Sequence, residues 1–171
     1  MSRLSSFSPA ALKAMFSPEG DDTLAVLLTI TGEGITTPIR LADNYTQRIS
    51  STADDVIYGI HSRGNDYVFL PFQITLPSEE ADAAPRCQIT LNDVTRYLTP
   101  TIRLATTALN VSIELVLTRT PDVLEISFPG FLMSGITYNA NSIVADLNVE
   151  SLAIEPFPAH TFTPSYFPGL Y

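Results

Sequence analysis

The chain has 171 residues, of which 45% are hydrophobic and only 16% are charged, and its mean hydropathy is +0.18. This length and composition exclude a disordered protein and favour one domain with one hydrophobic core. Eighteen acidic residues against nine basic ones give a net charge of −9, without a Lys/Arg cluster, so we expect no sequence-specific binding of nucleic acid.

The first third of the chain predicts a helix followed by a β-hairpin. Residues 8–16 read as a short helix, because Ser8 is a good N-cap and Pro9 suits the first helical position. Residues 23–31 are rich in β-forming side chains and end at a glycine turn, after which residues 36–41 return as the partner strand. Pro38 within that partner predicts an edge position or a bulge.

Residues 42–65 are rich in Asp, Asn, Ser and Gly and are too numerous for an ordinary connection. They form either a functional excursion or a hairpin of their own, and we interpret them as a long, partly extended loop. Strands are then predicted at 66–76 and 86–91, on either side of an acidic loop at 77–85.

A second short helix is expected near residues 93–105, limited by Pro100. Four strands follow at 110–118, 123–128, 131–138 and 142–150, joined by turns at Pro121–Asp122 and at 139–141. The first and last of them alternate apolar and polar residues, as half-buried antiparallel strands do. Their apolar faces are Val111, Ile113, Leu115 and Leu117, and Ile143, Ala145, Leu147 and Val149.

These elements predict a mainly β fold, an antiparallel β-sandwich or split barrel with one or two short helices. Residues 1–154 are expected to form this single domain, with the long loop at 42–65, and residues 155–171 form a C-terminal arm. No internal repeat is present.

The arm at 155–171 holds four prolines and five aromatic rings. Such a segment forms neither a helix nor a central strand, and it suits a groove on its own domain or on a neighbouring subunit. We therefore expect assembly rather than chemistry. The candidate interface residues are Tyr45, Tyr58 and His61 in the 42–65 segment and Phe157, Phe162, Tyr166, Phe167, Leu170 and Tyr171 in the arm.

No residue pattern points to catalysis or to a cofactor. His61 and His160 have no partner at metal-ligand spacing, and the pairs Asp21–Asp22 and Asp54–Asp55 are typical of turns and caps. No motif for a nucleophile or a phosphate loop occurs, so we predict no enzyme activity, no cofactor and no metal.

The single cysteine and the apolar runs bear on the compartment. Cys87 lies in a strand-like run and is expected to be a buried thiol, since one cysteine forms no intramolecular disulfide. The opening residues lack an apolar signal segment and no apolar run reaches the ~20 residues that span a bilayer. We expect synthesis in a cytoplasm and no membrane anchoring.

Four segments resemble a known family: Asp66-Tyr-Val-Phe-Leu-Pro-Phe72, Arg86-Cys-Gln-Ile-Thr-Leu-Asn92, the predicted hairpin across Pro121–Asp122, and the ending Phe162-Thr-Pro-Ser-Tyr-Phe-Pro-Gly-Leu170. Together they look like the small minor tail proteins of long-tailed bacteriophages. The resemblance covers essentially the whole chain, and its most specific piece is the Phe-Pro-Gly-Leu ending.

The resemblance implies a structural protein of the virion with a tail-tube-like fold, at the distal end of the tail. It would form a ring, a hexamer favoured over a trimer, that joins the tail tube protein to the hub and receptor-binding proteins and continues the DNA conduit. The iron–sulfur site of some lambda-like hub proteins is not expected, because this chain has one cysteine. The alternative is a carbohydrate- or receptor-binding β-sandwich module that uses Tyr45, Tyr58 and Tyr67.

Overall fold

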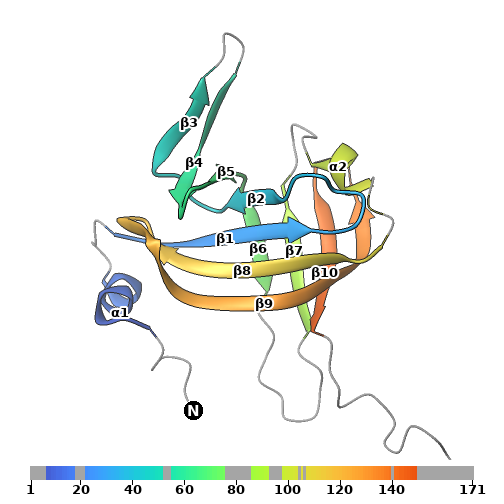
Figure 1. Ribbon diagram of the computed structural model, residues 1–171. Coiled ribbons are helices and arrows are strands. Elements are labelled where there is room, and N and C mark those ends of the chain that lie inside the picture. Colours follow the sequence, from blue (N-terminus) through green and yellow to red (C-terminus); the bar gives the residue numbers. More distant parts are fainter. Residues whose placement is uncertain are drawn as a thin grey trace, which may run out of the picture.

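The computed structural model describes residues 7–17, 22–51, 55–75, 86–92, 98–103, 105, 107–139 and 141–149 (Figure 1). The predicted C-terminal arm with its six interface residues, His160, Asp21, Asp54 and the acidic loop at 77–85 lie outside them. Two helices and ten strands are present in the described part of the chain. Their bounds are α1 Pro9–Phe16, β1 Leu24–Thr31, β2 Ile39–Ala42, β3 Gln47–Ser51, β4 Val56–Ser62, β5 Asn65–Phe69, β6 Phe72–Thr75, β7 Arg86–Leu91, α2 Thr99–Arg103, β8 Leu109–Leu117, β9 Thr120–Tyr138 and β10 Ile143–Val149.

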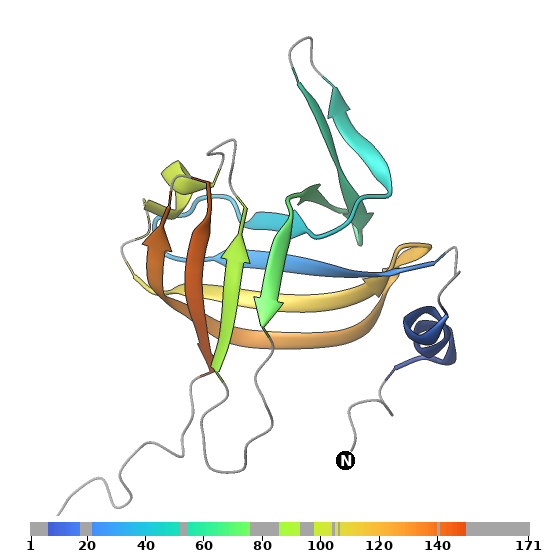
Figure 2. The same cartoon turned by 180° about the vertical axis from the view of Figure 1, so that it is seen from behind.

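The strands form one continuous sheet in the order β3-β4-β5-β2-β1-β8-β9-β10-β7-β6. Its pairs are antiparallel except β2 and β5, which run parallel over two residue pairs. The sheet bends over itself, so that β6, β7 and β10 cross steeply behind β1, β8 and β9 (Figures 1 and 2). The mainly β prediction is confirmed, and the sheet is mixed rather than purely antiparallel.

The bend is made in β9, which pairs with β8 along its first part and with β10 along its last. The prediction of two strands at 123–128 and 131–138 is wrong, because Pro129 and Gly130 form a bulge within one strand, where the register with β8 shifts and Gly130 has φ +84°. The predicted turn at Pro121–Asp122 is wrong as well, because both residues belong to β9. The chain reverses between Leu117 and Thr120 instead.

Two hydrophobic cores lie on the two sides of β1. Leu28 and Ile30 join the main core, whose other buried members come from β2, β7, β8, β9, β10 and the α2 region. Ala25 and Leu27 point the other way, into a second core. That core is completed by Ala42, Ile60, Tyr67 and Val116.

The predicted alternation in β8 and β10 is confirmed where side chains are described. Val111 and Ile113 in β8 are in the main core, as are Ile143, Ala145 and Leu147 in β10. Val116 follows Leu115 and points to the other face of β8, into the second core beside Ala25. Cys87 is buried in the main core as expected, and burial raises the pKa of its thiol.

At three prolines the bounds of the strands and helices differ from those predicted. Pro71 divides the predicted strand at 66–76 into β5 and β6, which lie far apart in the order of the sheet. Pro38 precedes β2 rather than lying within it, and β2 is an inner strand. Pro100 is in the first turn of α2, where a proline is tolerated, rather than at its end.

Helix α1 begins as predicted and lies beside the β8–β9 turn (Figure 1). The Ser8 hydroxyl accepts from the Ala11 N–H at 3.1 Å, and Pro9 is the first helical residue. The main-chain N–H and the hydroxyl of Ser8 donate to the two carboxylate oxygens of Glu125 in β9, at 2.9 and 2.8 Å. The cap residue therefore also docks the helix.

Asp43 fixes the chain where it leaves β2. The Val26 N–H donates to the Asp43 carboxylate at 2.8 Å, and the Asp43 N–H donates to the Val26 carbonyl at 3.2 Å. The side chain thus continues the β1–β2 ladder by one more bond. Burial raises the pKa of this carboxyl above its ordinary value of 3.8, against the opposing effect of the hydrogen bond from Val26.

Replacing Gly59 by alanine is expected to destabilise the protein far more than the same change at Gly130. A Cβ on Gly59 would lie 1.9 Å from the Tyr67 carbonyl oxygen and 2.5 Å from Ile49 Cδ1, whereas a Cβ on Gly130 meets no atom within 4 Å. Gly59→Ala should lower the free energy of unfolding by about 3 kcal/mol, and Gly130→Ala by about 1 kcal/mol through its positive φ. Denaturant melts of both variants measure the difference, and equal losses would contradict the close approach of β4 and β5.

Asp43→Asn is expected to stabilise the protein at pH 7. The folded state holds the proton of Asp43 more tightly than the unfolded chain, so the stability tied to this group falls as pH rises through its folded pKa. Asparagine keeps an oxygen acceptor for the Val26 N–H and removes the charge. The gain should be modest, because the side chain keeps some contact with water, and it should vanish at acid pH. Melts at pH 3 and pH 7 check this, and a variant that is less stable at pH 7 would refute it.

Candidate protein-interaction site

Strands β3 and β4 form a hairpin that stands away from the body (Figures 1 and 2). From here on, "the arm" means this hairpin and not the C-terminal segment 155–171. The two strands pair antiparallel from Gln47–Gly59 to Ser51–Val56, with a register shift at Ile49. The interpretation of residues 42–65 as a loop is therefore wrong, and the alternative of a separate hairpin is right. The sequence of β3 lacks the alternation of apolar and polar residues that marks a strand, because both of its faces are exposed or partly exposed.

The base of the arm is clamped onto the body by the β4–β5 turn. Arg63 and Gly64, with φ values of 49° and 77°, make a two-residue turn of the kind that favours tight hairpins. The Ser62 hydroxyl donates to the Pro121 carbonyl at 2.6 Å, and the Arg63 N–H donates to the Asp122 carboxylate.

An ion pair adds to this clamp. The Arg63 guanidinium donates to both carboxylate oxygens of Glu114 in β8, and this hydrogen bonding raises the pKa of Arg63. The side chain of Glu114 is only 17% exposed, so the pair is better shielded from water than an ordinary surface pair. The base of the arm is thereby tied to the β8–β9 hairpin at a fixed place.

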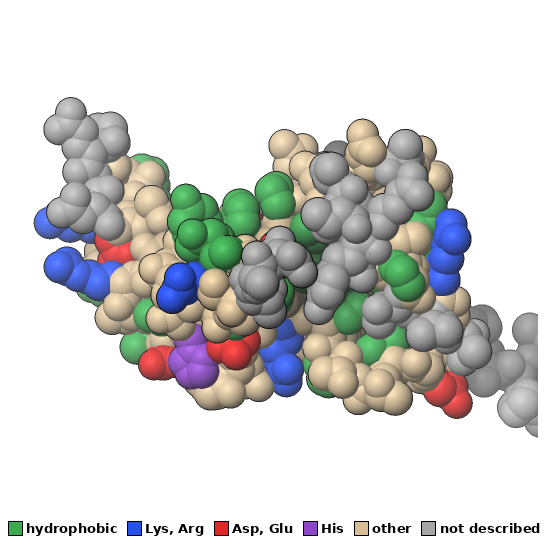
Figure 3. Space-filling view, turned by 90° about the horizontal axis from the view of Figure 1, so that it is seen from above, with side chains coloured by type: hydrophobic (Ala, Val, Ile, Leu, Met, Phe, Trp, Pro, Cys, Tyr) green, Lys and Arg blue, Asp and Glu red, His purple; other side chains and the backbone are tan. Residues whose placement is uncertain are grey.

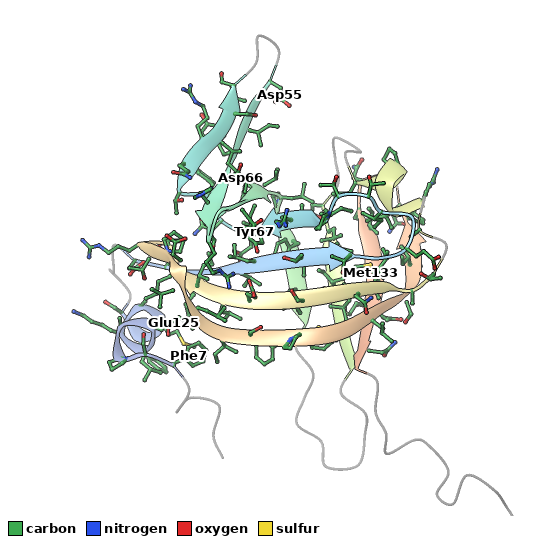
Figure 4. The ribbon with its side chains drawn as sticks, viewed as in Figure 1. Phe7, Asp55, Asp66, Tyr67, Glu125 and Met133 are labelled. Carbon is green, nitrogen blue, oxygen red and sulfur yellow. The ribbon has the colours of Figure 1, made fainter. Side chains whose placement is uncertain are left out.

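Tyr67 packs beneath the arm and not on its surface. Tyr67 is 4% exposed and belongs to the second core, and the Thr29 hydroxyl donates to the Tyr67 hydroxyl at 3.4 Å. Figure 4 shows Tyr67 at the base of the arm and Asp55 on the arm, away from the body. Tyr67 is therefore no part of an exposed aromatic surface, contrary to the alternative that grouped it with Tyr45 and Tyr58.

Three rings gather beside the arm, and we call Tyr45, Tyr58 and Phe69 the aromatic cluster. The Tyr45 ring centroid lies 5.6 Å from that of Tyr58 and 5.1 Å from that of Phe69, the second pair in an edge-to-face arrangement. Tyr45 is 54% exposed and Tyr58 is 47% exposed. Exposed, mutually packed rings of this kind are typical of protein interfaces.

The structure brings two of the predicted interface residues together and separates the third. Tyr45 and Tyr58 are in contact, but His61 is three positions after Tyr58 in β4, so it points to the opposite face. His61 is half exposed, and its Nδ1 lies 2.7 Å from the Asp66 carboxylate. Sequence reasoning missed Phe69, whose only signal is its place in the apolar run before Pro71.

The ends of the sheet are the other uncovered surface of the described chain. Strand β3 is one edge and β6 is the other. Edge strands normally carry charges or prolines that prevent pairing with other chains. Arg48 is the one charged residue of β3, and β6 has none, although Pro71 precedes it. Neither edge strand has a second partner strand among the described residues.

Asp22, from one of the acidic pairs, has a structural role. The Asp22 carboxylate accepts from the Thr118 hydroxyl and the Arg119 N–H, at 2.9 and 3.1 Å, so it caps the β8–β9 turn. No group of three potential metal ligands occurs among the described residues. In the same part of the chain, no helix has the length and apolar character to cross a membrane.

Comparison with known proteins gives a family without an assigned role. The sequence pattern of a domain of unknown function, DUF1833, matches residues 10–132, which include the arm, its clamp and the aromatic cluster. No curated protein matches the chain. Since the match covers well over half of its residues, the chain belongs to the DUF1833 family.

Proposed function

We propose that this chain is a structural protein of the tail of a long-tailed bacteriophage, a ring-forming component at the distal end of the tail. It joins the tail tube protein to the hub and receptor-binding proteins and continues the DNA conduit. The observation that carries the proposal is an open sheet whose two edge strands have no further partner among the described residues, together with a projecting arm. The resemblance of the sequence to minor tail proteins supplies the setting.

The two edges suit a ring because they differ. If β3 of one copy pairs with β6 of the next, each copy uses a different surface on each side, and such a contact closes into a ring when the rotation permits. Main-chain hydrogen bonds then join neighbouring subunits as they join neighbouring strands. Hexamers are favoured over trimers by analogy with distal-tail rings.

The arm supplies apolar area for the same contacts. Seen from above, on the face from which the arm rises, hydrophobic side chains gather beside it (Figure 3). Burying an exposed tyrosine ring of the aromatic cluster at an interface removes of order 100 Å² from water, worth about 2.5 kcal/mol before the cost of ordering.

The charge of the chain agrees with a conduit for DNA. A net charge of −9 disfavours adhesion to phosphates, and carboxylates that face a channel would let the genome pass without binding.

Tyr45→Ala combined with Tyr58→Ala is expected to abolish or weaken ring formation. Truncating a central interface ring costs about 2 kcal/mol or more, so each subunit contact should weaken by well over tenfold. Negative-stain electron microscopy and light scattering of the purified chain measure the assembly. Val123→Ala with Leu124→Ala removes comparably exposed apolar side chains from β9 and serves as the control. Unchanged rings in the tyrosine variant, or a chain that stays monomeric alone and with its tail tube protein, would contradict the proposal.

A second candidate is a carbohydrate-binding module of the tail tip, favoured by the exposed, tilted pair of Tyr45 and Tyr58. If it holds, the purified chain gives reproducible hits on a glycan array, and Tyr58→Ala removes them. An array without hits rejects this candidate and leaves the structural role intact.

A further inference from the structure

A cleft with a volume of about 290 Å³ lies between β2 and β5. Its lining includes Ile39 and Arg40 of β2, Asp66 and Val68 of β5, and Leu98, which precedes α2. Ile39 and Leu98 are buried, so the cleft has an apolar floor. This volume is at the lower end for ligand pockets, and it fits one long side chain of a partner better than a cofactor.

The strand register shows which side chains point into the cleft. Leu41 is opposite Val68 in the parallel β2–β5 pair, and residues opposite each other point to the same face of a sheet. By alternation, Ile39 and Asp66 share that face. Arg40 lies between Ile39 and Leu41 and points to the other face, so it lines the cleft with its main chain. Asp66 is therefore the one charged side chain of the lining that faces the cleft.

The Asp66 carboxylate has room for a further donor. Its Oδ1 lies 2.7 Å from Nδ1 of His61, and the side chain is more than half exposed. Among the described residues, its second oxygen has no hydrogen-bond donor, and a carboxylate oxygen accepts up to two hydrogen bonds. A carboxylate with one oxygen occupied suits a single ammonium better than a guanidinium, which binds both oxygens side by side.

We propose that this cleft binds a lysine side chain of a partner protein. The methylene groups of the lysine lie over Ile39, Val68 and Leu98, and its ammonium donates to the Asp66 carboxylate. The net charge of −9 favours the approach of a basic partner. The site is separate from the aromatic cluster and does not depend on the proposed tail role.

The probe is a fluorescent peptide with one lysine between flanking glycines, and three comparison peptides differ from it at the lysine alone. Nε-acetyl-lysine keeps the stem and removes the charge, diaminopropionic acid keeps the charge and removes most of the stem, and arginine replaces the ammonium by a guanidinium. Fluorescence anisotropy with the full chain measures the four affinities.

The lysine peptide should bind about threefold more tightly than the acetyl-lysine peptide, since Asp66 is partly exposed to water, and about tenfold more tightly than the short-stem peptide. Asp66→Asn should remove the preference for lysine over acetyl-lysine. Asp146→Asn is the matched control, because it removes the same charge from an exposed position in β10 outside the cleft lining, and it should leave the preference unchanged. His61→Ala frees the second oxygen of Asp66, so it should raise the affinity for the arginine peptide relative to the lysine peptide.

His61, Asp66 and Asp146 are exposed, so the three variants are expected to fold, and circular dichroism checks this. The proposal is overturned if the lysine peptide does not bind the wild-type chain, if it binds no more tightly than the acetyl-lysine peptide, or if the Asp66 and Asp146 substitutions have equal effects. Equal binding of the short-stem peptide would equally refute the role of the apolar floor.

Discussion

The structure depends on a strand that has no free face. In β1, Leu27 and Leu28 are neighbours that point in opposite directions, and both are completely buried. Leu28 belongs to the main core and Leu27 to the second core, which holds β4 and β5 to the body. Each such side chain contributes about 1.5–3 kcal/mol by leaving water. Strand β1 is therefore covered on both faces. One face closes the main core of the body, and the other carries the second core, which attaches the arm.

The parts of the fold that follow from local signals could be predicted from the sequence. The Ser8–Pro9 start of α1, the β1–β2 hairpin and the alternation in β8 and β10 each rest on residues close in sequence. The errors come from long-range pairing. Pro129 and Gly130 look like a strand end, but pairing with β8 on both sides of them carries β9 through as a bulge. Conversely, Pro71 looks tolerable in a strand, yet the two halves join opposite parts of the sheet.

The candidate site was predictable by residue type and not by geometry. Tyr45 and Tyr58 are large exposed rings in a polar segment, which marks them as interface candidates. Their contact depends on the β3–β4 register, and the addition of Phe69 depends on β5 lying beside β4. The Arg63–Glu114 ion pair joins residues that are 51 positions apart, so no spacing rule reveals it. Tyr67 shows the same limit, because its burial follows from the second core and not from its neighbours in sequence.

Strand β5 lies between two surfaces, the aromatic cluster and a cleft lined by Ile39, Asp66, Val68 and Leu98, and the alternation of its side chains keeps them apart. Phe69 points to the same face as the buried Tyr67 and joins the aromatic cluster, whereas Asp66 and Val68 point to the other face and line the cleft. The rings and the cleft therefore lie on opposite faces of β5. The β4–β5 turn is held to the body by the ion pair of Arg63 with Glu114 and by the hydrogen bond from the Arg63 N–H to Asp122. Both surfaces therefore keep a constant position relative to the body.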